Sequence, residues 1–183
     1  MKHLPLIVLC LIASSIFAAD DWPGVKYAEV RAYAWFDRKD HKEEDVILKD
    51  MSLKQGVINP DGALLSEEQV KVLLKAVTGV HKDHPIAGCY EPHNAFIFYN
   101  SEKKPVAFVE VCFGCLGQRI SPEGAAKRID LPALAGIFGE LKLPMGEYAD
   151  AKAFTESFEK RLKLGEEANE PAKKHAPESP ARK

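Results

Sequence analysis

Two short apolar runs in the middle of the chain, separated by a polar spacer, predict a β-hairpin. The runs are Ala95–Tyr99 and Val106–Val111, and the spacer between them is Ser101–Pro105. Aromatic and β-branched residues dominate both runs, and such residues favour strands. The proline that closes the spacer supports a turn of about five residues between the two strands.

Pairing these two strands brings sulfur-bearing side chains together at the open end of the hairpin. Counting back from the turn along both strands places His93 near Cys112, and Cys89 near Cys115. All three cysteines that follow the first twenty residues therefore converge with one histidine. The sequence predicts a site at this position.

The alternation of side chains in Val25–Phe36 predicts a further strand, with Val30 and Trp35 on opposite faces. The first helix is predicted to begin after Ser66, because Gln69 three residues later completes a capping box. Gly79 is expected to end this helix.

Two more helices are predicted in the second half of the chain. Asp130 can cap one of them, with Pro132 in its first turn, and apolar residues recur at helical spacing over residues 150–164 to form the other. The segment Leu116–Gly124 is predicted to be a loop. Helices and a hairpin in mixed order indicate a small single α+β domain, in which an antiparallel sheet is packed by about three helices.

The length and the charge of the chain indicate one folded core and argue against nucleic-acid binding. The chain has 183 residues and 46% hydrophobic content, which is enough for one core. Its formal net charge is −2, and its lysines and arginines are dispersed. Because nucleic-acid binding needs a basic stripe or patch, no nucleic-acid partner is expected.

The N-terminus has the layout of a secretory signal peptide. A positive start at Met1–His3 precedes the apolar run Leu4–Phe17, and the small residues Ala18 and Ala19 come before a polar change. We therefore expect a signal peptide over 1–19 and export to the periplasm or the extracellular space, with no membrane association after its removal. The folded domain is expected over 20–164, followed by a disordered, proline-rich tail over 165–183.

The cysteine cluster is first interpreted as a structural metal site. Zinc in such sites takes four thiolate or imidazole ligands, and Cys89, His93, Cys112 and Cys115 supply three sulfurs and one nitrogen. Thiolates would also suit Cu(I). The roles of two nearby histidines, His81 and His84, are left open.

Two other interpretations of the cluster remain. Lys104–Cys115 is similar to the thioredoxin pattern, in which a buried strand leads into C-x-x-C, and this resemblance implies thiol–disulfide exchange by Cys112 and Cys115. The resemblance covers about twelve residues, and the predicted hairpin departs from the βαβ crossover of that fold. In the other interpretation, two of the three cysteines form a structural disulfide, as is usual outside the cytosol.

Motifs typical of hydrolases and nucleotide-binding enzymes are missing from the sequence. It contains no G-x-S-x-G, no H-E-x-x-H and no glycine-rich phosphate loop. A binding or structural role is therefore favoured over an enzymatic one, and neither substrate nor partner can be named from the sequence.

Overall fold

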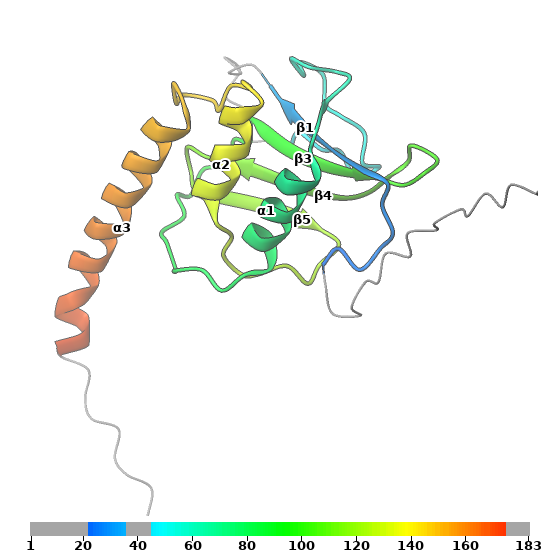
Figure 1. Cartoon of the computed structure of the whole chain (residues 1–183). Helices are drawn as coiled ribbons and strands as arrows, with labels where there is room; N and C mark the ends of the chain where they lie inside the picture. The colour runs from blue at the N-terminus through cyan, green and yellow to red at the C-terminus, as the bar shows by residue number, and fades with distance from the viewer. Residues whose placement is uncertain (1–21, 36–44, 175–183) are drawn as a thin grey trace, which may run out of the picture.

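Five antiparallel strands form one sheet in the computed structural model, which describes residues 22–35 and 45–174 (Figure 1). The order of the strands across the sheet is β2-β1-β3-β4-β5. Their bounds are Glu29–Ala34 for β1, Ala63–Leu64 for β2, Asn94–Tyr99 for β3, Pro105–Cys112 for β4 and Gly117–Ser121 for β5. The predicted hairpin, β3–β4, therefore occupies the centre of the sheet.

The register of this hairpin confirms the predicted pairing. Asn94 lies opposite Val111, which brings the residues that precede β3 to the end of β4. At the turn, the side chain of Asn100 accepts hydrogen bonds from the backbone N–H groups of Glu102 and Lys104, both at 3.0 Å. This asparagine thus satisfies backbone donors that no strand partner reaches.

The predicted caps of the first two helices are also confirmed. Helix α1 spans Glu67–Thr78, and Ser66 and Gln69 form the expected reciprocal capping box. Helix α2 spans Leu131–Glu140, and the carboxylate of Asp130 accepts a hydrogen bond from a first-turn N–H. Each cap satisfies donors that a helix N-terminus otherwise leaves unpaired.

The third helix is longer than the sequence pattern predicts. Helix α3 spans Ala151–Lys174, so it continues past Leu164, and its C-terminal part extends beyond the sheet (Figure 1). The apolar stripe of this helix ends near Leu162, which is why an amphipathic pattern gives an earlier end. The end of the folded domain stays a prediction, and residues 175–183 lie outside the described part of the chain.

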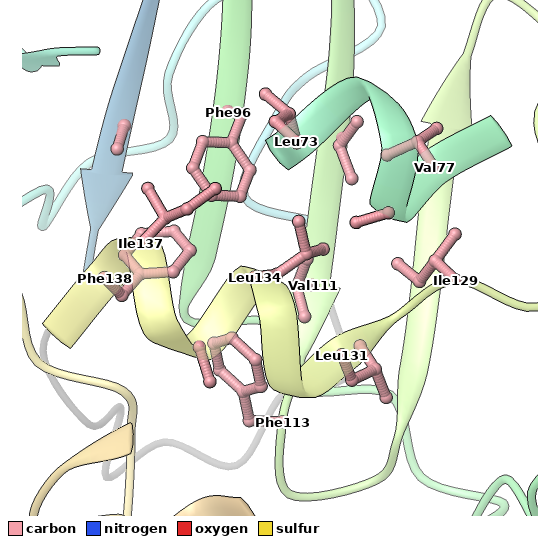
Figure 2. Close-up of a cluster of buried hydrophobic side chains, with 14 of the residues drawn as sticks. Leu73, Val77, Phe96, Val111, Phe113, Ile129, Leu131, Leu134, Ile137 and Phe138 are labelled. Atoms are coloured by element: carbon pink, nitrogen blue, oxygen red, sulfur yellow. The ribbon is translucent and has the colours of Figure 1, made fainter. Parts of the chain in front are cut away.

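Helices α1 and α2 cover one face of the sheet and bury the larger apolar cluster against it (Figure 2). The side chains at the centre of this cluster are Leu73, Val77, Phe96, Val111, Phe113, Ile129, Leu131, Leu134, Ile137 and Phe138. A smaller cluster lies on the opposite face, where residues of the segment 46–57 cover the sheet. It contains Tyr33, Trp35, Val46, Ile47, Ala95, Ile97 and Phe108. The sheet is therefore buried on both faces.

The predicted loop over Leu116–Gly124 is wrong, because β5 forms there and pairs with β4. This strand has the sequence GQRIS, which carries little of the β-branched and aromatic signal that identifies a strand. Pairing with a central strand therefore decides its conformation. The predicted fold class, a small single α+β domain with an antiparallel sheet and three helices, is confirmed.

In residues 22–35 and 45–174, none of the helices combines the length and the apolar character that crossing a bilayer requires. The predicted signal peptide lies outside these residues.

Candidate functional site

A disulfide bond between Cys112 and Cys115 closes the turn that joins β4 to β5. The Cα atoms of the two cysteines are 5.6 Å apart, within the usual range for a disulfide. Both residues are buried, with 3% and 1% of their surface exposed, whereas Cys89 is a free, exposed cysteine. The odd number of cysteines after residue 20 is thus explained by one bond and one thiol.

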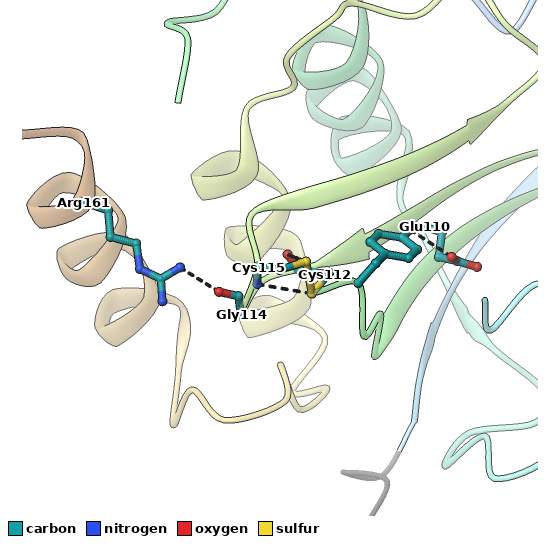
Figure 3. The surroundings of a disulfide bond; sticks show 6 residues. Glu110, Cys112, Gly114, Cys115 and Arg161 are labelled. Carbon is teal, nitrogen blue, oxygen red and sulfur yellow. Dashed lines mark hydrogen bonds between the residues drawn. A yellow bond between two sulfur atoms is a disulfide. The ribbon is translucent and has the colours of Figure 1, made fainter. Parts of the chain in front are cut away.

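Hydrogen bonds from three parts of the chain hold this turn, and Figure 3 shows the one within the turn and the one from α3. The backbone N–H of Cys115 donates to Sγ of Cys112 at 3.2 Å. Ala87, in the loop before β3, donates its N–H to the carbonyl of Cys115 at 2.9 Å. From α3, the guanidinium of Arg161 donates to the carbonyl of Gly114 at 2.7 Å. The turn is therefore fixed by the preceding loop and by α3 as well as by its own disulfide.

The disulfide lies in the wall of a cavity of about 350 Å³. The other wall residues come from the loop before β3, from the start of β3 and from the segment after α2. The full lining is Cys89, Glu91, His93, Asn94, Cys112, Phe113, Gly114, Cys115, Met145, Gly146 and Glu147. The predicted convergence of the three cysteines with His93 is therefore confirmed.

The predicted zinc site at Cys89, His93, Cys112 and Cys115 is nevertheless wrong. The disulfide takes up two of the three thiolates that zinc or Cu(I) would need, and a bonded sulfur is not a thiolate ligand. Within the described ranges, no group of three or more His, Cys, Asp or Glu side chains is placed to hold a metal ion. The spacing of the cysteines and His93 in the sequence correctly predicts that they converge, but it does not distinguish a metal site from a disulfide.

The wall of the cavity is rich in hydrogen-bond acceptors. Asn94 is 1% exposed, and its amide Nδ2 donates to the carbonyl of Pro144 at 2.8 Å. This bond fixes the orientation of the amide, and among the described residues Oδ1 has no hydrogen-bond partner. The carboxylates of Glu91 and Glu147 lie in the same wall, and no lysine or arginine lines it. The cavity therefore offers oxygen acceptors and negative charge.

Glu110, a buried glutamate next to this site, was not predicted from the sequence. Glu110, in the middle of β4, has 0% exposure and accepts hydrogen bonds at 2.8–3.0 Å from the backbone N–H groups of Val46 and Ile47 and from the hydroxyl of Tyr90. The guanidinium of Arg119 on β5 completes the set, with Nη2 at 2.8 Å. The sequence does contain a signal for this residue, because Glu110 is the charged residue inside an otherwise apolar strand.

These contacts shift the acid–base properties of two partners of Glu110. Burial raises the pKa of the Tyr90 hydroxyl well above its ordinary value, and the negative charge of Glu110 acts in the same direction. For Arg119, burial alone would lower the pKa, but the hydrogen bond and the charge of Glu110 outweigh it, so the pKa is raised. Tyr90 therefore stays protonated as a donor and Arg119 stays charged.

The two histidines whose roles were left open lie outside the cavity wall. His84 is 4% exposed, and its ring contacts Phe158 of α3 with centroids 5.5 Å apart. The His81 ring lies beside Gly79 at the end of α1. His84 therefore packs against α3, and neither histidine lines the cavity.

The burial of His84 predicts a pH-dependent stability. Burial lowers the pKa of this histidine in the folded protein, while the unfolded chain keeps the ordinary value of about 6.5. Below that value the unfolded state binds more protons, so the free energy of unfolding should fall as the pH is lowered. Urea denaturation at pH 7.5 and 5.5 should show a smaller loss for His84→Gln than for the wild type. Equal losses would contradict the prediction.

Comparisons of the chain with protein-family models, with curated proteins and with solved structures found no match.

Proposed function

We propose that the chain is an exported, non-enzymatic binding domain in which the Cys112–Cys115 disulfide braces the wall of a ligand cavity. The observation that carries this proposal is the position of the disulfide, which is buried in its turn and yet lines a cavity of about 350 Å³. This volume is within the range of small-molecule sites. A disulfide in an exported protein is also the expected state of paired cysteines.

The acceptors in the wall favour a small ligand that carries an ammonium group. The oxygen of Asn94 is buried without a partner among the described residues, and a ligand donor would satisfy it. Glu147 supplies negative charge beside the CxxC turn, since its Oε1 is 3.4 Å from the position that a Cβ on Gly114 would occupy. A ligand ammonium would meet both groups.

Catalysis of thiol–disulfide exchange on a thioredoxin-like plan has weaker support. In proteins of that kind the first cysteine is activated at the N-terminus of a helix. Here a strand, β5, begins two residues after Cys115, and every strand pair of the described sheet is antiparallel. The arrangement therefore lacks the feature that stabilises a catalytic thiolate in that fold.

The bracing role predicts a modest loss of stability without the disulfide. The bond closes a loop of four residues, for which the chain-entropy relation gives about 2 kcal/mol. The double variant Cys112→Ser, Cys115→Ser should therefore unfold at lower urea concentration than the wild type. Cys89→Ser is the matched control and should unfold like the wild type. An unchanged midpoint in the double variant would remove the bracing role.

The ligand class is tested by a pair of probes of similar size and opposite charge. Butylamine should raise the thermal midpoint by binding to the folded state, while butyrate should not. Glu147→Gln should remove most of the effect of the amine, because it removes the negative charge beside the disulfide. Equal responses to both probes, or an undiminished response in the variant, would contradict an ammonium site.

Export is supported by the layout of residues 1–19. The proposal expects the protein recovered from its native host to begin near Asp20, as read from its intact mass. A chain that still carries Met1–Phe17 would contradict export by a cleaved signal peptide.

A further inference from the structure

The free thiol of Cys89 lies in the same cavity wall as the disulfide. Contacts on both sides of Cys89 hold its loop against the β4–β5 turn. On one side, Ala87 donates its backbone N–H to the carbonyl of Cys115 at 2.9 Å. On the other side, the ring of Tyr90 lies against Gly117, and its hydroxyl donates to Glu110 at 2.9 Å. The residues on both sides of Cys89, Ala87 and Tyr90, are therefore held in place by contacts with the rest of the fold.

Both Ala87 and Tyr90 contact the chain on the Cys115 side of the disulfide. A Cβ on Gly117 would lie 3.1 Å from Sγ of Cys115 and 3.1 Å from Cδ2 of Tyr90. Glycine at this position lets the aromatic ring of the loop approach the sulfur closely. Because Ala87 and Tyr90 flank Cys89 and both contact the Cys115 side, Cys115 is the disulfide cysteine that this loop approaches.

The sulfur of Cys112 has a hydrogen-bond donor that would stabilise it as a leaving group. The backbone N–H of Cys115 donates to Sγ of Cys112 at 3.2 Å, and a hydrogen bond of this kind is stronger when its acceptor carries a negative charge. A thiolate that forms on Cys112 is thus stabilised at once. In thiol–disulfide exchange, a more stable leaving thiolate leaves faster.

From this arrangement we propose that Cys89 exchanges with the disulfide inside the folded protein. The thiol of Cys89 first gives its proton to solvent, and its sulfur attacks Sγ of Cys115. The Cys112–Cys115 bond breaks, a Cys89–Cys115 bond forms, and the electron pair leaves on Cys112, which takes up a proton. One disulfide and one thiol are present before and after, so the step needs no oxidant. The product links the loop before β3 covalently to the β4–β5 turn and frees Cys112 in the cavity.

The sequence makes this exchange easy to detect. No lysine or arginine lies between Cys112 and Cys115, so trypsin leaves both in one peptide, whereas Lys103 separates them from Cys89. A Cys112–Cys115 bond therefore lies within one peptide. A Cys89–Cys115 bond joins two peptides, and mass spectrometry distinguishes the two cases.

The test compares Cys112→Ser with its matched control Cys115→Ser in the full chain. Each variant is oxidised with diamide, its remaining thiols are blocked with N-ethylmaleimide in denaturant at pH 6, and it is digested with trypsin. The joined peptide pair should be about tenfold more abundant in Cys112→Ser, because only that variant keeps the sulfur that Cys89 attacks. Equal abundance in the two variants, or maleimide on both Cys89 and Cys115 in Cys112→Ser, would overturn the proposal.

The wild type supplies a second measurement that does not depend on a variant that folds. After incubation at pH 8 without oxygen, the same blocking step should place maleimide on a minor fraction of Cys112 as well as on Cys89. Cys89→Ser should carry none on Cys112. If circular dichroism shows that Cys112→Ser is unfolded, this measurement decides, and label confined to Cys89 in the wild type overturns the proposal.

Discussion

Replacing Glu110 by alanine is expected to lower the free energy of unfolding by about 3–5 kcal/mol, because it removes the buried acceptor of an ion pair and of three further hydrogen-bond donors. The substitution removes the buried carboxylate partner of Arg119, which keeps its contacts with Asp45 and the carbonyl of Ile47, and leaves the hydroxyl of Tyr90 without its acceptor. It also removes the acceptor of the backbone N–H groups of Val46 and Ile47, which lie outside the five strands. Each buried donor without a partner costs a further part of the total.

Urea denaturation measures this loss, and Glu102→Ala is its control. Glu102 pairs with Lys104 on the exposed hairpin turn, where substitutions usually change stability by less than about 0.5 kcal/mol. Glu110→Gln should fall between the two, because the amide keeps one acceptor and loses the charge. A Glu110→Ala variant as stable as its control would mean that Glu110 does not organise this part of the fold.

Phe154→Ala is expected to lower the free energy of unfolding by about 3–5 kcal/mol, as for other buried phenylalanines. Phe154 is 0% exposed and is the more deeply buried of the two phenylalanines, Phe154 and Phe158, that α3 places in the core. Its ring contacts Phe113, inside the CxxC turn, with centroids 4.8 Å apart, and Tyr148 at 5.1 Å. Losing the ring leaves a cavity between α3 and the turn that carries the disulfide.

Leu164→Ala on the same helix is the matched control for this substitution. Leu164 is 57% exposed, so its truncation should change the unfolding midpoint little. Because alanine has the highest helix propensity, neither substitution weakens the helix itself, and the contrast between the two positions isolates the loss of core packing. Similar effects at both positions would contradict the packing of α3 through Phe154.

Local signals explain why much of the fold was predictable from the sequence. The capping box at Ser66, the cap at Asp130 and the turn after Asn100 each depend on side chains that act within a few residues. The hairpin register follows from the length of its turn, so the convergence of Cys89 and His93 with the CxxC motif could be counted from the sequence.

The errors concern properties that depend on partners distant in the chain. Strand β5 forms because β4 offers it a ladder of hydrogen bonds, and its own residues carry little strand signal. Glu110 is buried as a charge only because three separate segments bring donors to it. The choice between metal and disulfide depends on the geometry of two sulfurs in a turn, which ligand spacing does not reveal.

The central claim is that Cys112 and Cys115 form a disulfide in the wall of a cavity that also holds a free Cys89. Peptide mapping without reduction, on protein blocked with N-ethylmaleimide in denaturant, tests it most directly. The predicted major species carries maleimide on Cys89, while the peptide with Cys112 and Cys115 is unlabelled and lighter by two hydrogens. Maleimide on each of Cys89, Cys112 and Cys115 in the major species would contradict the disulfide and the bracing role proposed for it.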